Sequence, residues 1–347
     1  MGVGLMYRLG RLIFLTTPGF YIHCTDVHVV FEQDGQPKRN IMYRDLESIV
    51  VFHDRTTLSA YVMRKCAENG IAIHYVSIYG KYLGSFVGYD KTNVMLRKLQ
   101  FQMIDNQKGF RYVQCLLQAK LKNSVRLLKY YGHHATNKEH IDEICEYLKD
   151  ATVKLKTATD INDLRMIEMN AAREYYSTFD GLIKSKDECM KYEKRSHHPG
   201  LNNFNVLLNF FYVLLTCQCD AALTVMGLDS ECGILHTLKS GRYSLACDLV
   251  EEFRAVIVDK FVIKMVNLGK VKSNDFTSES GEIRLTDDVR KKLLIEWDNW
   301  LHNEKLFSVY WNKDLPAGVM VYEQARLLAQ YVRGDIEDYA AFFARLY

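Results

Sequence analysis

The chain changes its hydrophobic period once, near residue 88, so its two parts must build different secondary structure. Before this point the apolar segments are short and rich in β-branched and aromatic residues, as in RLIFLTT, SIVVF and IAIHYVSI, which is typical of strands. After it, long segments with helical spacing predict helices at 92–131, 138–155, 161–192, 203–226, 242–269, 286–304 and 318–333. The sequence therefore predicts an α+β protein, with a β-rich domain at 1–88 and a larger all-α domain at 89–347.

Two local signals refine the strand-rich part. The pair Asp34-Gly35 in QDGQ predicts a hairpin turn, because this pair tolerates the positive φ that tight turns need. Residues 57–69 have the pattern of a single helix, and Gly70 directly after them is a typical helix C-cap.

The composition is that of an ordinary soluble globular protein, since 48% of the 347 residues are hydrophobic and 25% are charged. The nine cysteines include no Cys-x-x-Cys pair, and the start of the chain lacks a secretory leader pattern. We therefore expect reduced thiols and a cytoplasmic location. Cys217, Cys219 and Cys232 could form a thiolate metal site, but cysteines on an apolar helix are more often small buried hydrophobes, and we favour core packing.

The most apolar segment, residues 204–226, is about long enough to span a bilayer. Four polar side chains interrupt it: Asn205, Asn209, Gln218 and Asp220. These groups would be costly in hydrocarbon, whereas a helix inside a large helical domain can satisfy them with partners. We therefore predict a central core helix and no membrane association.

Basic residues dominate the segment from Lys91 to Tyr130, which contains nine lysines and arginines and one acid, Asp105. A solvated helix face is the usual interpretation of such a run, but such faces normally alternate acids and bases to form intrahelical pairs. Because the acids are missing, the segment favours binding to a phosphate backbone.

One histidine and several carboxylates recur in and around the stretch GILHTLKSGRYSLACDLVEEFR. His236 precedes a predicted helix on which Asp248 lies on the same face as Glu251 or Glu252, at offsets of three and four residues. Upstream, Glu168 is followed on its amphipathic helix by two alanines that allow close packing. Such mixed nitrogen and oxygen donors suit a magnesium or manganese ion that activates an oxygen nucleophile. A purely structural role remains open on spacing alone.

Several motifs together carry a resemblance to a known family. GILHTLKSGRYSLACDLVEEFR resembles the signature of the CRISPR-associated protein one family, the spacer-acquisition integrase. LRMIEMNAAREYY, LNNFNVLLNFFYVLL, GLDSECGILH, QAKLKNSVRLL and YEQARLLAQYVRGDIEDY resemble further segments of that family. Order and spacing agree over nearly the whole chain, most closely with the form found in type I-C systems.

The resemblance implies a metal-dependent DNA endonuclease and integrase. By position, Glu168, His236 and Glu251 are the implied metal ligands, and Asp248 is an adjacent acid that supports the same site. The implied cofactor is Mg²⁺ or Mn²⁺, and the implied reaction is attack of a 3′-hydroxyl of short foreign DNA on a phosphodiester at the edge of the CRISPR repeat. This transesterification needs no ATP.

The resemblance also assigns supporting roles. Double-stranded DNA, both the short foreign fragment and the CRISPR repeat, is the implied substrate. The strand-rich part would form a homodimer, and a small ferredoxin-like CRISPR-associated protein would bind elsewhere. The candidate phosphate contacts are Lys120, Lys122, Arg126, Arg242 and Arg254, although the last two could simply balance the acids. The loop KRSHHPG, with His197 and His198, could contact DNA near the site or be inert.

The chain departs from the family pattern at a few positions. Met169 stands where the family usually has glycine, which could crowd the backbone beside Glu168, and AAFF stands in place of a Pro-Pro-Phe segment near the end. No implied ligand is lost, so we expect activity. The main alternative is a DNA-binding scaffold of the same fold with an inactive site, and a non-haem iron oxygenase is disfavoured because only one histidine joins the cluster.

Overall fold

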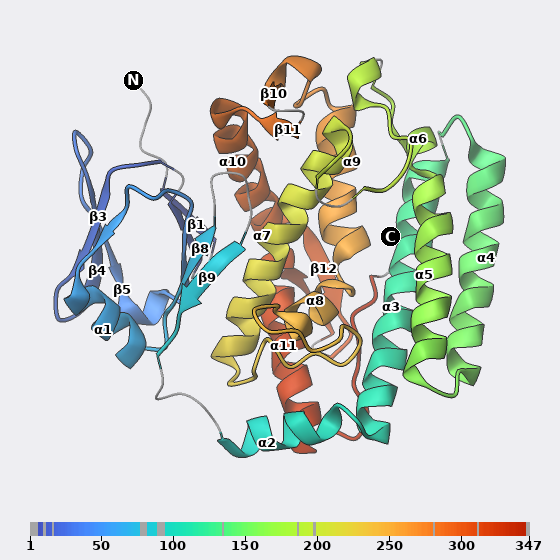
Figure 1. The fold of residues 1–347 in the computed structure, drawn as a ribbon, viewed down its shortest axis with the longest axis horizontal. Coiled ribbons are helices and arrows are strands. Elements are labelled where there is room, and N and C mark those ends of the chain that lie inside the picture. Colours follow the sequence, from blue (N-terminus) through green and yellow to red (C-terminus); the bar gives the residue numbers. More distant parts are fainter. Residues whose placement is uncertain are drawn as a thin grey trace.

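The structure of the protein is a computed structural model with strands in its N-terminal part and mainly helices in its C-terminal part (Figure 1). The structure describes residues 6–9, 12–15, 17–76, 82–88, 94–133, 135–185, 187–196, 199–279, 282–310 and 312–344. Lys91, His197 and His198, for which the sequence suggested DNA contacts, lie outside the described residues.

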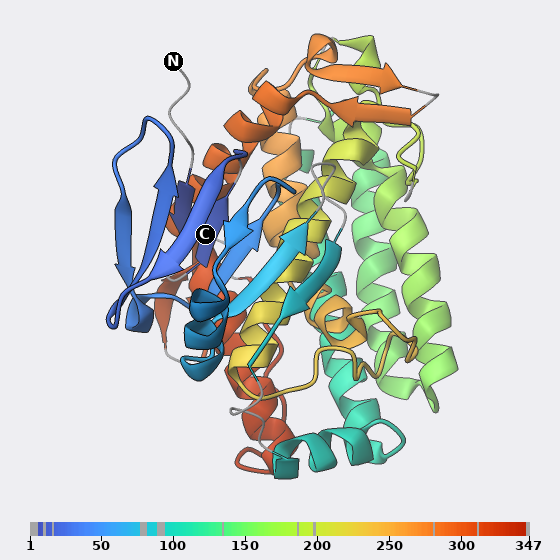
Figure 2. The ribbon, with the colours of Figure 1, turned by 60° about the vertical axis from the view of Figure 1, so that its left-hand side comes forward.

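Two sheets build the N-terminal part (Figures 1 and 2). The five-stranded sheet has the order β1-β2-β6-β8-β9, in which β2, β6 and β8 run parallel and the two outer pairs are antiparallel. Its strands are β1 (Met6–Leu9), β2 (Leu12–Leu15), β6 (Ser48–Val51), β8 (Ala72–Val76) and β9 (Tyr82–Phe86). The four-stranded sheet has the order β5-β4-β3-β7, with β3 (Phe20–Cys24), β4 (His28–Gln33), β5 (Arg39–Met42) and β7 (Thr57–Leu58). The two sheets share a hydrophobic core that includes Ile13, Ile22, Phe31, Ile49 and Ile73.

Both local predictions for this part are confirmed, one of them with a shorter helix. Strands β4 and β5 pair antiparallel, and Gly35 in the connecting turn has a φ of 72°. Helix α1 (Ala60–Glu68) begins after Ser59, whose hydroxyl accepts a hydrogen bond from the backbone N–H of Val62. The two residues predicted as its first turn instead form β7.

The helices follow the predicted segments, with three interruptions. They are α2 (Val94–Met103), α3 (Gln107–Gly132), α4 (Lys138–Thr157), α5 (Ile161–Ser177), α6 (Phe179–Leu182), α7 (Asn203–Val225), α8 (Ser244–Val250), α9 (Lys260–Asn267), α10 (Asp287–Asn303) and α11 (Ala317–Arg333). Asn106 separates α2 from α3 because its side chain accepts hydrogen bonds from the backbone N–H groups of Lys108 and Gly109. The helix predicted at 161–192 stops at Leu182, and the one predicted at 242–269 contains a π-helical segment, Arg254–Asp259, between α8 and α9.

The expectation of an all-α second part is wrong in one respect. Two short antiparallel hairpins flank α10: β10 (Phe276–Glu279) with β11 (Glu282–Leu285), and β12 (Lys305–Ser308) with β13 (Lys313–Pro316). Strands of four residues are too short to give a clear alternation of apolar and polar positions, so the helical periodicity on either side masks them.

Helix α7 is long and apolar enough to cross a membrane, but 78% of its most apolar window is buried within the protein. Its polar side chains have the partners expected of a core helix. Asn205 accepts a hydrogen bond from Arg195 at 3.0 Å, and Gln218 donates one to the carbonyl oxygen of Gly318 at 3.3 Å. In Figure 1 this helix lies between the sheets and the helices α3, α4 and α5, which agrees with the predicted central core helix.

The two parts are in direct contact through the second face of the five-stranded sheet. On β6, Ile49 and Val51 face the core between the sheets, whereas Val50 belongs to the core of the helical part. On β8, Nδ1 of His74 lies 3.2 Å from a carboxylate oxygen of Asp220 on α7, and both side chains are buried. The strands end at Phe86 and α2 begins at Val94, so the boundary at residue 88 stays a prediction that falls between these elements.

Candidate metal-dependent catalytic site

Helices α3 and α5 and the turn after α8 bring two carboxylates onto one ammonium group. Nζ of Lys120, on α3, lies 2.6 Å from Oε2 of Glu251 and donates a hydrogen bond to Oε1 of Glu168, on α5. Arg254 completes the group, because its Nη1 donates to Oε1 of Glu251 at 2.8 Å. We call these four residues, Lys120, Glu168, Glu251 and Arg254, the acid–cation cluster.

Helical spacing explains why these side chains meet. On α5, Leu164, Ala171 and Tyr175 are buried, and Glu168 lies on the same face at offsets of three and four residues. Ala171 is fully buried, so its small side chain allows α5 to approach α3 closely. The position of Glu168 on this packed face therefore follows from the sequence pattern, whereas the cation opposite it does not.

Burial and charge act against each other in the cluster, and charge prevails. Lys120 is 8% exposed and Glu251 is 4% exposed. Burial lowers the pKa of Lys120, but the carboxylates of Glu168 and Glu251 outweigh it and raise this pKa above its ordinary value. Burial likewise opposes ionisation of Glu251, yet Arg254, Lys120 and His236 lower its pKa to about 2. Lys120 and Glu251 are therefore both held in their charged forms.

His236 is held in one orientation by a buried carboxylate. Its Nδ1 lies 2.7 Å from Oδ1 of Asp248, which is fully buried and also accepts hydrogen bonds from the backbone N–H groups of Ile234, Leu235 and His236. Because a carboxylate only accepts, Nδ1 carries the proton toward Asp248, and Nε2 is the ring nitrogen that the neutral imidazole would offer to a metal ion. Asp248 is thus the acceptor for Nδ1 of His236, and the sequence did not identify this acceptor. Its carboxylate oxygens also bind the backbone of the loop that carries His236.

A glycine permits this loop to pass close to α8. A Cβ atom on Gly233 would lie 2.6 Å from the backbone carbon of Ser244 at the start of the helix. Any other residue would push the loop away from α8 and separate His236 from Asp248. The glycine of the motif GILH is therefore required by packing.

The acid–cation cluster contains part of the donor set that a divalent metal ion needs. Among the described residues, no group of three His, Cys, Asp or Glu side chains is close enough to hold a metal by itself. The reason is visible in the cluster, since the ammonium of Lys120 lies between Glu168 and Glu251, and Asp248 is saturated by the loop. The donor chemistry nevertheless fits a hard dication, because two carboxylates already share one cation.

A pocket of about 510 Å³ opens beside the cluster on the side of Glu168. Its lining includes Glu168, Arg254, Tyr176 and Arg195. Met169 also lines it and is 62% exposed, so its side chain faces the pocket and does not crowd the backbone of α5. The carboxylate of Glu168 and the three guanidinium groups of Arg173, Arg195 and Arg254 at one opening suit a phosphate group held next to a metal ion.

Tyrosines connect Arg254 to a buried acid below the site. Nη2 of Arg254 donates to the hydroxyl of Tyr176 at 3.2 Å, and the two hydroxyls of Tyr176 and Tyr212 lie 2.8 Å apart. Asp259 is fully buried and accepts hydrogen bonds from Tyr175 and Tyr212. Burial raises the pKa of Asp259. Tyr176 and Asp259 were not singled out from the sequence, and Arg195 was considered only as part of the basic loop KRSHHPG.

The predicted DNA-contacting residues do not form one surface. The structure corrects the prediction that Lys120 contacts DNA phosphates. Its ammonium is buried in the acid–cation cluster and does not lie on a solvated stripe. Lys122 is exposed and lies over the ring of Phe343, 5.1 Å from its centre, while Arg126 and Arg242 are half-buried. Residues two apart on a helix point in very different directions, so a basic segment on a long buried helix divides between core and surface.

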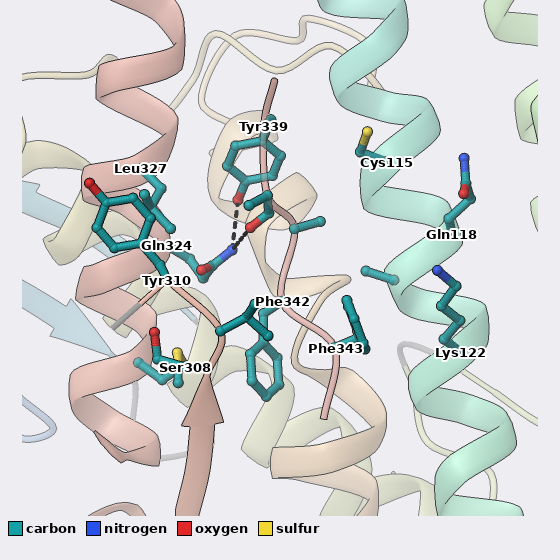
Figure 3. A pocket seen from close by; sticks show the side chains of 15 residues that line it. Cys115, Gln118, Lys122, Ser308, Tyr310, Gln324, Leu327, Tyr339, Phe342 and Phe343 are labelled. Atoms are coloured by element: carbon teal, nitrogen blue, oxygen red, sulfur yellow. Dashed lines mark hydrogen bonds between the residues drawn. The ribbon is translucent and has the colours of Figure 1, made fainter. Parts of the chain in front are cut away.

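The C-terminal segment, residues 339–344, packs against Glu252 and Asn123, next to the acid–cation cluster. Glu252, next to Glu251, accepts hydrogen bonds from the hydroxyl of Tyr339 and from the backbone N–H of Phe342. Asn123 on α3 donates to the carbonyl oxygen of Phe342 at 3.0 Å. Residues 339–343 of this segment line a pocket of about 220 Å³, and Figure 3 shows Gln324 and Tyr339 directed toward each other there. The AAFF sequence therefore still supplies a buried phenylalanine, Phe342, which stacks on Phe253 at 5.5 Å.

Two solved structures share this fold. A chain of a Cas6-RT-Cas1–Cas2 complex has a TM-score of 0.81 and 22% sequence identity, with 99% of the present chain and 37% of that chain covered. A casposase bound to its integration product has a TM-score of 0.78 and 21% identity, with 95% of the present chain and 93% of that chain covered. The architecture is therefore that of the Cas1 and casposase class of folds.

Sequence comparison gives the family. The model of the family "CRISPR associated protein Cas1" matches residues 13–299. A CRISPR-associated endonuclease Cas1 from Moorella thermoacetica is 32% identical, over 98% of this chain and 100% of the relative. One from Chlorobaculum tepidum is 33% identical, over 96% and 98%. The chain belongs to the Cas1 family of CRISPR-associated endonucleases, which confirms the resemblance at the level of the family.

Proposed function

We propose that this protein is a metal-dependent DNA endonuclease and integrase of CRISPR adaptation, which joins 3′-hydroxyl ends of short foreign DNA into the CRISPR repeat by transesterification. The observation that carries the proposal is the convergence of Glu168 and Glu251, from different elements, on one cation beside an oriented His236. The names of the relatives support the reaction class, since they are endonucleases and one neighbour of the same fold is a casposase with its integration product.

Glu168, Glu251 and His236 would hold the ion, either Mg²⁺ or Mn²⁺. When bound, such an ion supplies Lewis-acid stabilisation of the phosphate and favours loss of the proton from the attacking hydroxyl. His236 would contribute Nε2, because Asp248 keeps the proton on Nδ1.

The remaining residues of the site would bind and orient the DNA. Arg254 pairs with Oε1 of Glu251 and Lys120 contacts Oε2, so this carboxylate is held in a defined orientation. Arg195 and Arg254 line the pocket and would place positive charge next to a phosphate. Lys122, Arg126 and Arg242 would contact the DNA backbone farther away.

Several further features belong to this proposal. The resemblance of the motifs supports the type I-C form. It also supports a homodimer formed through the N-terminal sheets and a small ferredoxin-like adaptation partner, and one neighbour of the same fold is part of a complex that contains Cas2. A cytoplasmic location is supported by the nine cysteines, all of which are free thiols in the structure.

A strand-joining assay tests the proposal. The protein, its small partner, a short duplex with free 3′-hydroxyls and a plasmid with a CRISPR leader and repeat would be incubated with Mn²⁺, and covalent joining would be scored. We expect Glu251→Gln and His236→Ala to lower joining by more than about a hundredfold, because each removes a metal ligand. Glu143→Gln, on the exposed face of α4, is the matched control and should leave joining unchanged.

The alternative is a DNA-binding scaffold with an inactive site. DNA binding without joining by the unmodified protein, under conditions in which another Cas1 is active, would favour the scaffold. Joining that persists in a folded Glu251→Gln protein would contradict the assignment of the site.

A further inference from the structure

Lys120 is the residue of the acid–cation cluster that the proposed reaction leaves without a role. It is a lysine on the long helix α3 with 8% exposure, and it contacts both carboxylates that would bind the metal ion. Burying a lysine is costly unless carboxylates compensate it, so this side chain is held where it is by Glu168 and Glu251.

The charges of the cluster balance without a metal ion. The carboxylates of Glu168 and Glu251 are matched by the ammonium of Lys120 and the guanidinium of Arg254. A dication added to this group would leave two positive charges uncompensated in a largely buried place. Binding of the ion is therefore favoured only if one of the resident cations leaves the carboxylates.

The geometry selects Lys120 as the cation that leaves. Its Nζ lies 2.6 Å from Oε2 of Glu251, and magnesium–oxygen bonds are about 2.0–2.1 Å long, so an ion on the same oxygens would contact the ammonium. Arg254, in contrast, pairs with the other oxygen of Glu251, donates to Tyr176 and lies over the ring of Tyr212, 4.5 Å from its centre. Arg254 is anchored on three sides, whereas the ammonium of Lys120 is held by the two carboxylates alone among the contacts described.

The surroundings allow the ammonium to move in one direction. The small hollow that Lys120 itself lines has a volume of only about 10 Å³. The pocket of about 510 Å³ lies on the side of Glu168, whose side chain is 24% exposed. A lysine has a flexible four-carbon stem, so its ammonium can turn toward this pocket without movement of α3.

We propose that Lys120 is a resident cation that neutralises Glu168 and Glu251 before the metal ion binds. When the ion binds, it displaces the ammonium of Lys120 into the pocket. The inference rests on the proposed function, because it concerns the same metal site. Lys120 is a positioning residue: it keeps two carboxylates together on separate elements when no ion is present. The same ammonium competes with the ion, so it lowers the affinity of the site for metal.

Manganese binding to the DNA-free protein tests the competition, with free Mn²⁺ measured by electron paramagnetic resonance. Lys120→Met is expected to bind Mn²⁺ about tenfold or more tightly, since it removes one positive charge at contact distance. Lys120→Arg keeps the charge and should not tighten binding, and neither should Lys154→Met on the exposed face of α4. Unchanged or weaker binding by a folded Lys120→Met protein would overturn the proposal.

A second measurement uses the unmodified protein, so it does not depend on the folding of a variant. Lysines would be acetylated with an N-hydroxysuccinimide ester with and without saturating Mn²⁺, and each site would be quantified by peptide mass spectrometry. Lys120 should be protected without Mn²⁺ and react several-fold faster with it, while exposed Lys154 reacts equally in both. Equal protection of Lys120 in both conditions would overturn the proposal.

Glu251→Gln separates the failure of this proposal from the failure of the proposed function. If this variant binds Mn²⁺ as tightly as the unmodified protein, the metal site itself is wrong and both proposals fall. If it binds Mn²⁺ more weakly, but either measurement on Lys120 fails to give the expected result, only the role of Lys120 is wrong.

Discussion

At the scale of single residues, the partners of a charged side chain decide its role. Lys120 and Lys122 are two positions apart on α3, yet the first is buried between carboxylates and the second is exposed over a phenylalanine ring. Asp248 and Glu251 are likewise one helical turn apart, but the first accepts hydrogen bonds from three backbone N–H groups and an imidazole, and the second faces two cations. In neither pair does the type of residue predict the different roles of its two members.

Asp248 should therefore matter through His236. In Asp248→Asn the amide nitrogen cannot accept a hydrogen bond, so part of the loop and the ring of His236 lose their acceptor. We expect strand joining to fall by roughly 10- to 100-fold, as for other groups that orient a metal ligand. Asp150→Asn, on the exposed face of α4, is the control. Full activity of a folded Asp248→Asn protein would show that the ring needs no orienting partner.

At the scale of elements, irregular backbone places the site. The π-helical segment Arg254–Asp259 follows directly on the turn that carries Glu251, and its two ends supply the arginine of the cluster and the buried acid below it. π-Helical turns are rare and occur frequently at functional sites. A regular helix from α8 through α9 would rotate Arg254 relative to Asp259, so the predicted single helix at 242–269 would not have built this arrangement.

Helix α10 carries an acid whose titration should be visible in stability. Burial raises the pKa of Asp298 to about 6, despite the opposing effect of nearby His302. Because the folded state holds this proton more tightly than the unfolded chain, the free energy of unfolding should fall as the pH rises from 3.8 to about 6. Allowing for the partial exposure of the group, the loss should be about 2 kcal/mol.

Urea unfolding of Asp298→Asn and the parent protein at several pH values checks this expectation. Between pH 3.8 and about 6 the parent protein should lose unfolding free energy relative to Asp298→Asn. Above about pH 6 the difference between the two proteins should stay constant. A difference that does not change with pH would mean that Asp298 has an ordinary pKa.

At the scale of the whole molecule, two hydrophobic cores pack against each other in the part of the chain that the structure describes. One core lies between the two sheets, and the other extends through the helical part and reaches the five-stranded sheet at Val50 and Phe52. The buried pair of His74 and Asp220 joins β8 to the central helix α7 in this region. The sheets are therefore fixed against the helices that carry the site.

Loss of this pair should weaken the whole protein. Asp220→Ala leaves His74 buried without its carboxylate, and we expect the free energy of unfolding to fall by about 3 kcal/mol. The control is Asp335→Ala, which breaks an exposed pair with Arg333 and should cost less than about 1 kcal/mol. Equal effects of the two substitutions on urea unfolding would show that the buried pair does not couple the two parts.

The sequence by itself determined the features that depend on spacing along the chain. The change of period separated strands from helices, the Asp34-Gly35 pair marked a turn, and the polar positions of 204–226 marked a core helix. The motif around His236 placed Asp248 and Glu251 three residues apart, at the end of a helix. These results are local, because hydrogen bonding within an element and the burial of one face repeat with a fixed period.

Only the tertiary structure decided which distant groups meet. The meeting of Lys120 with Glu168 and Glu251, and of the C-terminal segment with Glu252 and Asn123, joins residues far apart in the chain. Their approach depends on how α3, α5 and the turn after α8 pack, which no periodicity along one element encodes. A lysine that looked like a DNA contact is therefore an internal counter-charge, because electrostatic partners are set by distance in space.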